Sequence, residues 1–316
     1  MSGASASTAT ATTAIADGTP GAARTTQRPG YVGRFAPSPT GSLHLGSLVA
    51  ALGSFADARS RGGRWLLRME DLDAGRVIAG CAERILCTLE SFGLHWDGAV
   101  EYQSARTLHY ERALESLVAG GVTFQCSCSR SEREGLGGYP GTCRQGPRRS
   151  GPTATRFRVQ DITVSFEDRA QGVRTFALRE RGDVVIRRRD GAFAYQLAVV
   201  VDDALQGITH IVRGADLLDS TPWQLALQRS LELPALTYLH LPLILEPDGG
   251  KLAKSRRSVP LDPARAGRQL HRALRLLRQE PPAELELEPG TTVLQWACAN
   301  WRPERFRGVG EVRIAP

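Results

Sequence analysis

Runs of apolar residues in the first part of the chain change from strand-like to helical spacing and back. An apolar run over residues 31–35 predicts a strand, and apolar positions that recur at helical spacing from Leu45 predict a helix that Gly62 and Gly63 end. A second apolar run, over residues 65–69, predicts another strand. Strand, helix and strand within about 40 residues form a crossover unit, so we expect a parallel sheet of the nucleotide-binding type.

Similar patterns predict the elements of the remaining chain. Helical spacing recurs over residues 78–92, 108–118, 195–205, 264–277 and 293–301, and extended runs lie over 155–159, 184–188 and 208–212. Ser220, Thr221 and Pro222 favour a helix cap and first turn, so they predict one more helix. The region 106–186 is rich in cysteines and glycine loops, which indicates a smaller domain inserted into the sheet domain.

These patterns predict an α/β protein with five parts. In chain order they are a disordered tail (1–29), the first half of a Rossmann-type parallel-sheet domain (30–105), the inserted domain (106–186), the second half of the sheet domain (187–240), and a lysine loop with a short helical C-terminal region (241–316). The tail is expected to be disordered because it contains almost no large apolar side chain.

The chain is basic, with a formal net charge of +7 over 316 residues and arginine clusters such as Arg148-Arg149. This balance favours nucleic acid or a nucleotide as partner, although a solvated basic face has the same composition. No run of about 18 apolar residues occurs, so we expect no membrane span. Six cysteines without an apolar secretory segment favour a reducing cytoplasm, and we expect a monomer.

The chain contains only two lysines, and both lie in the pentapeptide Lys251-Leu252-Ala253-Lys254-Ser255. Arginine supplies every other basic side chain. A segment that keeps lysine in such a chain is expected to need a compact, mobile ammonium group, which the planar guanidinium cannot replace. A glycine-rich turn over residues 248–250 leads into the pentapeptide, so we predict a mobile phosphate-binding loop.

A proline-rich segment connects the first predicted strand to the first predicted helix. It reads Arg34-Phe35-Ala36-Pro37-Ser38-Pro39-Thr40-Gly41-Ser42-Leu43-His44-Leu45-Gly46-Ser47. Free amides and the dipole at a helix start favour phosphate. We expect His44 to donate to a phosphate oxygen, and Gly46 has no side chain to block an adenine or a ribose. The alternative is a proline-rich turn with a surface histidine.

Together, His44-Leu45-Gly46-Ser47 and the lysine pentapeptide resemble the HIGH and KMSKS signatures of class I aminoacyl-tRNA synthetases. Ser47 departs from the signature, which ends in histidine, so one ribose or phosphate contact is expected to be absent. The wider likeness is to the glutamyl branch and runs over residues 31–254. It is carried by the segment from Arg34 and by residues 68–73, 193–203 and 212–216.

The resemblance implies that ATP, together with Mg²⁺, activates glutamate at a site that these segments form. The implied catalytic residues are His44, Lys251 and Lys254, and the implied ATP contacts are His44, Gly46 and Lys254. Little covalent chemistry falls to the protein in such a reaction, because positioning and charge stabilisation of the transferring phosphate provide most of the catalysis.

Glutamate carries an ammonium group and two carboxylates, so its pocket needs an acid and more than one planar base. Glu70 is expected to hold the ammonium group, and Arg34 and Arg213 are expected to take carboxylate oxygens. Tyr195 would add a hydroxyl donor near the side chain. Taken singly, such residues more often form surface ion pairs. The remaining implied glutamate-binding residues are Phe35, Ala36, Pro37 and Ser38.

A second group of residues lies in the predicted inserted domain. Cys126, Cys128 and Cys143 supply three thiolates with a short first spacing, which suits tetrahedral zinc but leaves the fourth ligand open. By resemblance to the zinc-containing insertion of glutamyl-type enzymes, the Tyr139 phenolate fills that position. The alternative is a set of free, reduced cysteines. Three further cysteines fall among apolar neighbours in predicted helices and are expected in the core: Cys81, Cys87 and Cys298.

The resemblance covers the catalytic part of a glutamyl-tRNA synthetase, and 56 residues (261–316) follow the lysine loop. We therefore expect no anticodon-reading domain and a ligase of the glutamyl-Q tRNA(Asp) synthetase group. That resemblance implies activation of L-glutamate without tRNA and transfer to queuosine in the anticodon stem-loop of tRNA(Asp). Three alternatives stay open: a truncated glutamyl-tRNA synthetase that charges the tRNA 3′ end, a non-catalytic zinc and RNA-binding module, and a small-molecule nucleotidylyltransferase.

Overall fold

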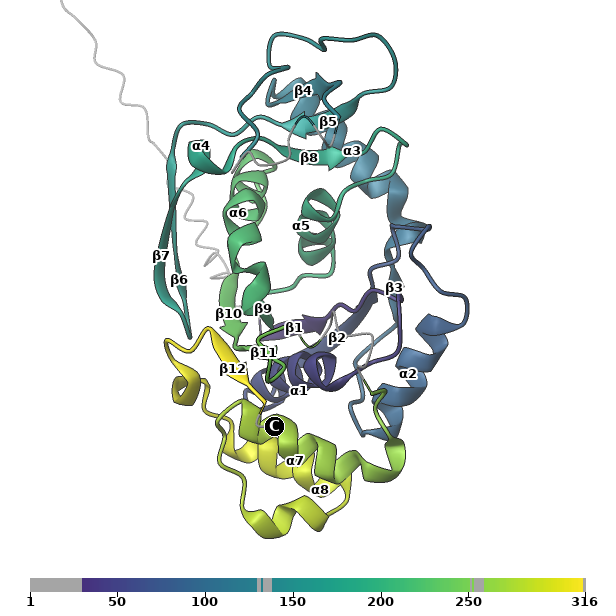
Figure 1. Ribbon diagram of the computed structural model, residues 1–316, viewed down its shortest axis with the longest axis vertical. Coiled ribbons are helices and arrows are strands. Elements are labelled where there is room, and N and C mark those ends of the chain that lie inside the picture. The colour runs from purple at the N-terminus through teal and green to yellow at the C-terminus, as the bar shows by residue number, and fades with distance from the viewer. Residues whose placement is uncertain (1–29, 130–131, 133–137, 251, 253–258, 315–316) are drawn as a thin grey trace, which may run out of the picture.

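The computed structural model describes residues 30–129, 132, 138–250, 252 and 259–314 (Figure 1). The predicted tail, Lys251 and Lys254 lie outside these residues. The strands are β1 (Val32–Phe35), β2 (Arg64–Met69), β3 (Glu101–Tyr102), β4 (Thr123–Cys126), β5 (Ala154–Phe157), β6 (Thr163–Asp168), β7 (Gly172–Ala177), β8 (Val184–Arg187), β9 (His210–Gly214), β10 (Thr237–Leu241), β11 (Leu243–Leu245) and β12 (Glu311–Arg313). The α-helices are α1 (Leu45–Arg59), α2 (Cys81–Ser91), α3 (Thr107–Ala119), α4 (Leu178–Arg181), α5 (Tyr195–Leu205), α6 (Thr221–Ser230), α7 (Ala266–Leu276) and α8 (Gly290–Asn300).

Parallel strands form the centre of the molecule. β1 pairs with β2 and β2 with β3, and in a second ladder β10 pairs with both β9 and β6, all in parallel. The two ladders meet at β1 and β9, where the Thr209 amide donates to the Val32 carbonyl and the Val32 amide donates to the Thr209 hydroxyl, both at 2.9 Å. The predicted α/β class with a parallel sheet is therefore confirmed.

Helix α1 packs directly on this sheet because most of its side chains are apolar and buried. Gly53 permits the close approach, since a Cβ at this position would lie 2.6 Å from Leu241 Cδ1 in β10. The same core takes in Trp65 from β2 and Leu270 from α7. The C-terminal helices thus complete the core of the sheet on the α1 side (Figure 1).

An antiparallel hairpin of β6 and β7 extends the sheet, and the sequence patterns did not predict it. Asp168 at the end of β6 pairs with Tyr238 of β10, which gives the strand order β7-β6-β10-β9. The hairpin lies within the range predicted for the inserted domain. Figure 1 shows it running along one side of the molecule, from beside β10 towards α4.

A second, antiparallel sheet of β4, β5 and β8 lies at the end of the molecule opposite α7 and α8 (Figure 1). It has a small core of its own, made by Phe124, Cys126, Tyr139 and Cys143. Apolar residues of α3, α5 and α6 pack between this sheet and the central one. The cysteine group is therefore well separated in the fold from α1 and the C-terminal helices.

The buried carboxylate of Asp57 in α1 joins three distant parts of the chain. It accepts hydrogen bonds from the Tyr31 hydroxyl (2.6 Å), both terminal nitrogens of Arg169 (2.6 and 2.8 Å) and the Trp301 indole (2.9 Å). Burial works against ionisation of Asp57, but Arg169 and Tyr31 outweigh it and lower its pKa. Such a fully bonded buried charge fixes the C-terminal segment to the sheet domain.

Most of the predicted elements are confirmed, and α5 has the predicted bounds. Two expectations are wrong. Cys87 is exposed, because the buried face of α2 is formed by Cys81, Ile85 and Leu89 and Cys87 points off that face. Ser220 makes no capping hydrogen bond at the start of α6. Over the described ranges, we find no helix that combines the length and the apolar character needed to cross a bilayer.

Candidate active site

Four of the predicted glutamate-binding residues come together at the carboxyl ends of the parallel strands. Arg34 lies in β1, Glu70 directly follows β2, and Arg213 lies in β9, while Tyr195 is the first residue of α5. The Tyr195 hydroxyl is 3.5 Å from Arg213 Nη1. Burial raises the pKa of Tyr195. The charges of Arg213 and Arg34 oppose this shift, and the charge of Glu70 adds to it. The carboxyl edge of such a sheet is where ligands bind.

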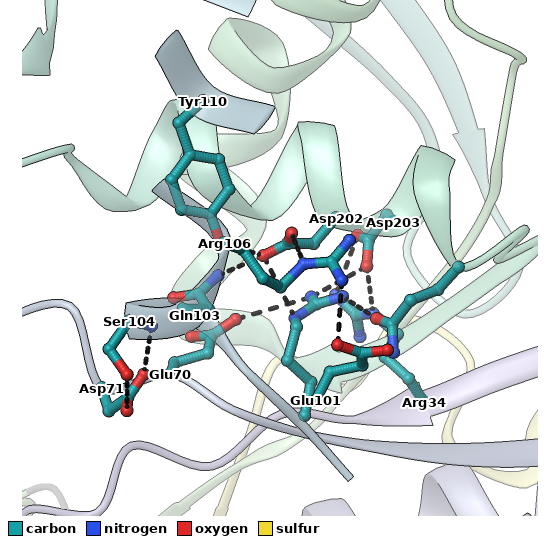
Figure 2. A network of polar contacts seen from close by, with 12 residues as sticks. Arg34, Glu70, Asp71, Glu101, Gln103, Ser104, Arg106, Tyr110, Asp202 and Asp203 are labelled. Atoms are coloured by element: carbon teal, nitrogen blue, oxygen red, sulfur yellow. Dashed lines mark hydrogen bonds and ion pairs between the residues drawn. The ribbon is translucent and has the colours of Figure 1, made fainter. Parts of the chain in front are cut away.

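Arg34 is not a free cation, because Asp203 of α5 neutralises it (Figure 2). The Arg34 Nε and Nη2 atoms donate to the two Asp203 oxygens at 3.0 and 3.3 Å, and Arg68 Nη2 donates to the same carboxylate at 2.9 Å. Burial opposes the Asp203 charge, but Arg34 and Arg68 hold its pKa below the usual range. Asp203 therefore fixes the orientation of the Arg34 guanidinium.

The neighbouring Asp202 anchors α5 to the segment that follows β3 (Figure 2). Its carboxylate accepts from Arg106 Nε (2.7 Å), Gln103 Nε2 (2.8 Å) and the Tyr110 hydroxyl (2.7 Å). Asp202 is fully buried, so its charge depends on these three donors. Both aspartates lie in the segment 193–203 that carries the family resemblance, and neither has a role predicted from the sequence.

Glu70 is an unusual carboxyl, because burial raises its pKa to about 7. The positive charges of Arg68 and Arg34 oppose this shift, while Asp203 adds to it. The nearest described cationic atom, Arg68 Nη2, is 3.6 Å away, and the Glu70 side chain is 12% exposed. A carboxyl that is costly to ionise and opens to a cleft gains most from an incoming cation.

Arg213 differs from Arg34, because within the described part of the chain all of its hydrogen bonds go to neutral groups. Its Nε donates to His240 Nε2 (3.1 Å) and its Nη2 donates to the Thr221 hydroxyl (2.8 Å). No carboxylate among residues the structure describes forms an ion pair with Arg213, although the residue is only 5% exposed. A buried cation without a counterion is costly, so the site is built to receive a negative charge.

The proline-rich segment links these residues to the start of α1. The Glu70 amide donates to the Pro37 carbonyl (2.9 Å), so this turn lies against the end of β2. Ala36 and Pro37 are half-buried and Ser38 is exposed. The Phe35 side chain lies in the core, where its ring stacks on that of Trp65 (6.2 Å between centroids).

His44 caps the N-terminus of α1. Its Nδ1 accepts from the amides of Gly46 (3.1 Å) and Ser47 (3.3 Å), so the ring proton is on Nε2, which is left as a donor. Burial lowers the pKa of His44 and favours this neutral form. The Ser47 hydroxyl accepts from the His44 amide (2.7 Å) and completes a capping box. Ser47 therefore fixes His44 from the position at which the family signature has a histidine.

A cavity of about 180 Å³ opens beside His44. Gly46, Gly214 and Leu252 are among the residues that line it. Leu252, the described residue of the lysine pentapeptide, would lie 3.6 Å from a Cβ at Gly46, so this side chain reaches the start of α1. A larger groove of about 750 Å³ lies between the end of α2 and the starts of α7 and α8, but no predicted site residue lines it.

Replacing Gly46 by alanine should reduce adenylate formation about tenfold. The new Cβ would lie 3.1 Å from His44 Cε1 and 3.2 Å from Nδ1, so the imidazole would have to move. The control is Gly41→Ala in the same segment, because nothing lies within 4 Å of a Cβ at that position. The initial rate of pyrophosphate exchange at saturating glutamate measures the effect, and equal rates for the two variants would contradict it.

The three predicted metal-binding cysteines and Tyr139 also come together. The Sγ atoms of Cys126, Cys128 and Cys143 all lie within 4.8 Å of one another. The Tyr139 hydroxyl is 3.4 Å from Cys126 Sγ and 3.6 Å from Cys128 Sγ. With ligands at about 2.3 Å (sulfur) and 2.0 Å (oxygen), a tetrahedral zinc would place sulfur about 3.5 Å from oxygen and about 3.8 Å from sulfur, so the four groups fit that ion.

The cluster also favours a thiolate at Cys143. Burial alone would raise the pKa of Cys143, but hydrogen bonds from Tyr139, Ser127 and Cys128 bring it to about 6. The Arg156 guanidinium lies over the Tyr139 ring, with its central carbon 3.8 Å from the ring centroid, and forms a cation–π contact. Thiolates are the form in which cysteines bind metals.

Comparisons with known proteins agree with this geometry. Residues 31–265 match the family of class I tRNA synthetases (E and Q), catalytic domain. The chain is 54% identical over 289 residues to the glutamyl-Q tRNA(Asp) synthetase of Ectopseudomonas mendocina, which covers 90% of this chain and 98% of that protein. It is 55% identical over 278 residues to the enzyme of the same name from Pseudomonas aeruginosa strain PAO1, covering 87% of this chain and 95% of that protein.

A solved structure shows the same fold at lower identity. The glutamate tRNA ligase of Elizabethkingia meningosepticum, in complex with its amino acid, superposes with a TM-score of 0.74 at 25% identity and covers 90% of this chain and 67% of its own. From the matched family and the two relatives, the chain belongs to the class I tRNA synthetases of the E and Q branch and, within them, to the glutamyl-Q tRNA(Asp) synthetase family.

Proposed function

We propose that the protein activates L-glutamate with ATP, without tRNA, and transfers the glutamate to queuosine in the anticodon of tRNA(Asp). The names of the relatives support the reaction. The structural observation that carries the choice of amino acid is that Arg213 pairs with no carboxylate of the described residues. A neutral glutamine side chain would leave that buried cation unpaired, whereas glutamate neutralises it.

In the proposed complex, Glu70 holds the α-ammonium group and Arg213 takes the side-chain carboxylate together with the Tyr195 hydroxyl. Arg34 is already paired with Asp203 and contributes a directed donor to a carboxylate oxygen rather than a net charge. The half-buried backbone of residues 36–37 and the exposed Ser38 would complete the pocket. Each charged group of glutamate would thus be bound at the end of a different strand: β1, β2 or β9.

ATP is proposed to lie over the start of α1, with its adenosine in the cavity that Gly46 and Gly214 line. One oxygen of the glutamate α-carboxylate attacks the α-phosphorus, the bond to the β-phosphate oxygen breaks, and pyrophosphate leaves. His44 Nε2–H, the dipole at the start of α1 and Lys254 would stabilise the negative charge on the transferring phosphate. Mg²⁺ enters with ATP as part of the substrate.

The proposed adenylate step has a direct test. With labelled pyrophosphate, ATP and glutamate, and without tRNA, the protein should form labelled ATP, and glutamine should support exchange at least about a hundredfold less efficiently. Absence of exchange would favour a non-catalytic zinc and RNA-binding module, and exchange that needs another carboxylate in place of glutamate would favour a different nucleotidylyltransferase.

The cysteine cluster and Tyr139 are proposed to hold one structural zinc. When bound, the ion would link β4 to the turn that carries Tyr139 and Cys143. Zinc analysis of the purified protein should find about one ion per chain, and Cys143→Ser should remove it and lower the melting temperature. Cys87→Ser, a change of an exposed cysteine, should leave both unchanged. Zinc-free protein with normal stability would instead favour free, reduced cysteines.

We also propose that the enzyme is a cytoplasmic monomer with an inserted zinc-binding domain within 106–186. All six cysteines are described and none is in a disulfide, which supports a reducing compartment. The sheet of β4, β5 and β8 lies at one end of the molecule, and exposed arginines in the loops next to it, such as Arg148, Arg149 and Arg188, would hold the anticodon stem-loop mainly through its phosphates.

A further inference from the structure

Arg213 contacts a buried imidazole, His240, which in turn contacts a buried carboxylate, Asp168. Asp168 ends β6 and His240 lies in β10, and their side chains are 1% and 0% exposed. His240 Nδ1 is 2.6 Å from Asp168 Oδ2, and His240 Nε2 is 3.1 Å from Arg213 Nε. The three residues therefore form a continuous chain from the unpredicted hairpin to the proposed glutamate site.

The position of the imidazole proton follows from this geometry. Arg213 Nε–H can only donate, so His240 Nε2 must accept and cannot carry a proton. The single proton of the neutral ring is then on Nδ1, where it donates to Asp168. Burial and the charge of Arg213 lower the pKa of His240 to about 4, against the opposing effect of Asp168, so the neutral ring is the form near pH 7.

The Asp168 carboxylate is itself held in one orientation. Its Oδ1 accepts from the amides of Ala170 (2.9 Å) and Gln171 (2.8 Å), and the His240 amide donates to Oδ2 (3.1 Å). Gln171 also donates to the backbone carbonyls of His240 (3.2 Å) and Val309 (3.0 Å). The turn after β6 and the C-terminal segment thus lock the acid that orients the ring.

We propose that Asp168 and His240 are positioning residues that select glutamate over glutamine by holding Arg213 in place without neutralising it. This inference rests on the proposed function and adds to it the device by which the amino acid is chosen. A carboxylate in direct contact with Arg213 would hold the guanidinium equally well, as Asp203 does for Arg34, but it would also satisfy the charge that glutamate must meet. A neutral imidazole fixes the guanidinium and leaves its charge available.

Asp168→Asn tests the orientation of the imidazole. The asparagine oxygen is expected to stay at the position that accepts two amides, so its NH₂ group would replace Oδ2 and face His240 Nδ1. The ring would then have to carry its proton on Nε2, where it meets Arg213 Nε–H, donor against donor. We expect KM for glutamate in pyrophosphate exchange to rise about ten- to a hundredfold, while KM for ATP stays within about twofold.

Two substitutions of His240 provide a matched pair. The glutamine amide can place its oxygen near the position of Nε2 and accept from Arg213, whereas the shorter asparagine amide reaches only the position of Nδ1. His240→Asn should therefore raise KM for glutamate about tenfold or more and reduce the preference for glutamate over glutamine by a similar factor. His240→Gln should restore most of both.

The outcomes separate this inference from the proposed function. If the wild-type protein shows no glutamate-dependent exchange, the proposed function fails. If the wild type exchanges but the two His240 variants have the same KM for glutamate and the same preference over glutamine, the positioning role is overturned. Melting temperatures are measured in parallel, and because the comparison of His240→Asn with His240→Gln decides the matter, it stands even if Asp168→Asn does not fold.

Discussion

Arg213→Gln is expected to lower kcat/KM for glutamate in pyrophosphate exchange about a hundred- to a thousandfold. The reason is the combination of burial and missing counterion: Arg213 is 5% exposed and bonds only to neutral groups among the described residues, so the substrate carboxylate is its proposed charge partner. Removing one member of a buried charge pair leaves the other desolvated and unpaired, which costs several kcal/mol. KM for ATP should change little.

The matched control is Arg229→Gln, which makes the same change at an exposed arginine in the last turn of α6. It should have wild-type kinetics, because the net charge changes equally but no site contact is lost. A loss in Arg229→Gln as large as that in Arg213→Gln would mean that overall charge, and not a contact to glutamate, causes the effect.

Glutamate activation is also expected to depend on the ionisation of Glu70. Burial raises the pKa of Glu70 to about 7 in the free protein. Below that pH the carboxyl is protonated, neutral and unable to pair with the α-ammonium group of glutamate. We therefore expect kcat/KM for glutamate to fall about tenfold per pH unit below about pH 7 and to level off above it. The bound ammonium group favours the carboxylate, so the corresponding fall in kcat should lie at lower pH.

Glu70→Gln provides the control for this pH dependence. The amide cannot ionise, so kcat/KM should be at least about a hundredfold lower than in the wild type at pH 8 and should not fall across the same pH interval. His44 and His240 have pKa values below their usual range, so their ionisation should not cause a fall in kcat/KM near pH 7 in this variant. A variant that keeps the wild-type profile would exclude Glu70 as its source.

The sequence predicts the first crossover unit and α5 well, because their patterns are local. Apolar residues dominate the central positions of α1 and β2, and Gly62 and Gly63 mark the end of the helix. The β6 and β7 hairpin was missed although both strands are partly apolar. What joins the hairpin to the central sheet is the pairing of Asp168 with Tyr238 of β10, a contact between residues far apart in the chain that no local pattern contains.

In the site, too, single residues could be predicted from the sequence but their long-range contacts could not. Arg34, Glu70, Tyr195 and Arg213 were found by chemistry and resemblance, and the structure brings them to one edge of the sheet. Their partners could not be found in this way, because the ion pair between Arg34 and Asp203 and the contact between His240 and Asp168 join residues 169 and 72 positions apart. No motif in the sequence singles out His240.

The different partners of Arg34 and Arg213 also could not be predicted from the sequence. Both were assigned to substrate carboxylates as equivalent planar bases. Only the three-dimensional structure places Asp203 against Arg34 and a neutral imidazole against Arg213. The charge available to a substrate is therefore a property of the partner residues, and it depends on how α5 and β10 pack around the strand ends.

The most direct test of the account is the transfer of labelled glutamate to tRNA(Asp) that lacks its 3′-terminal adenosine. With ATP and no other enzyme, we expect label on the RNA when the anticodon carries queuosine and none when guanosine occupies that position. Transfer that needs an intact 3′ end and ignores queuosine would contradict the account and identify the protein as a glutamyl-tRNA synthetase of the ordinary kind.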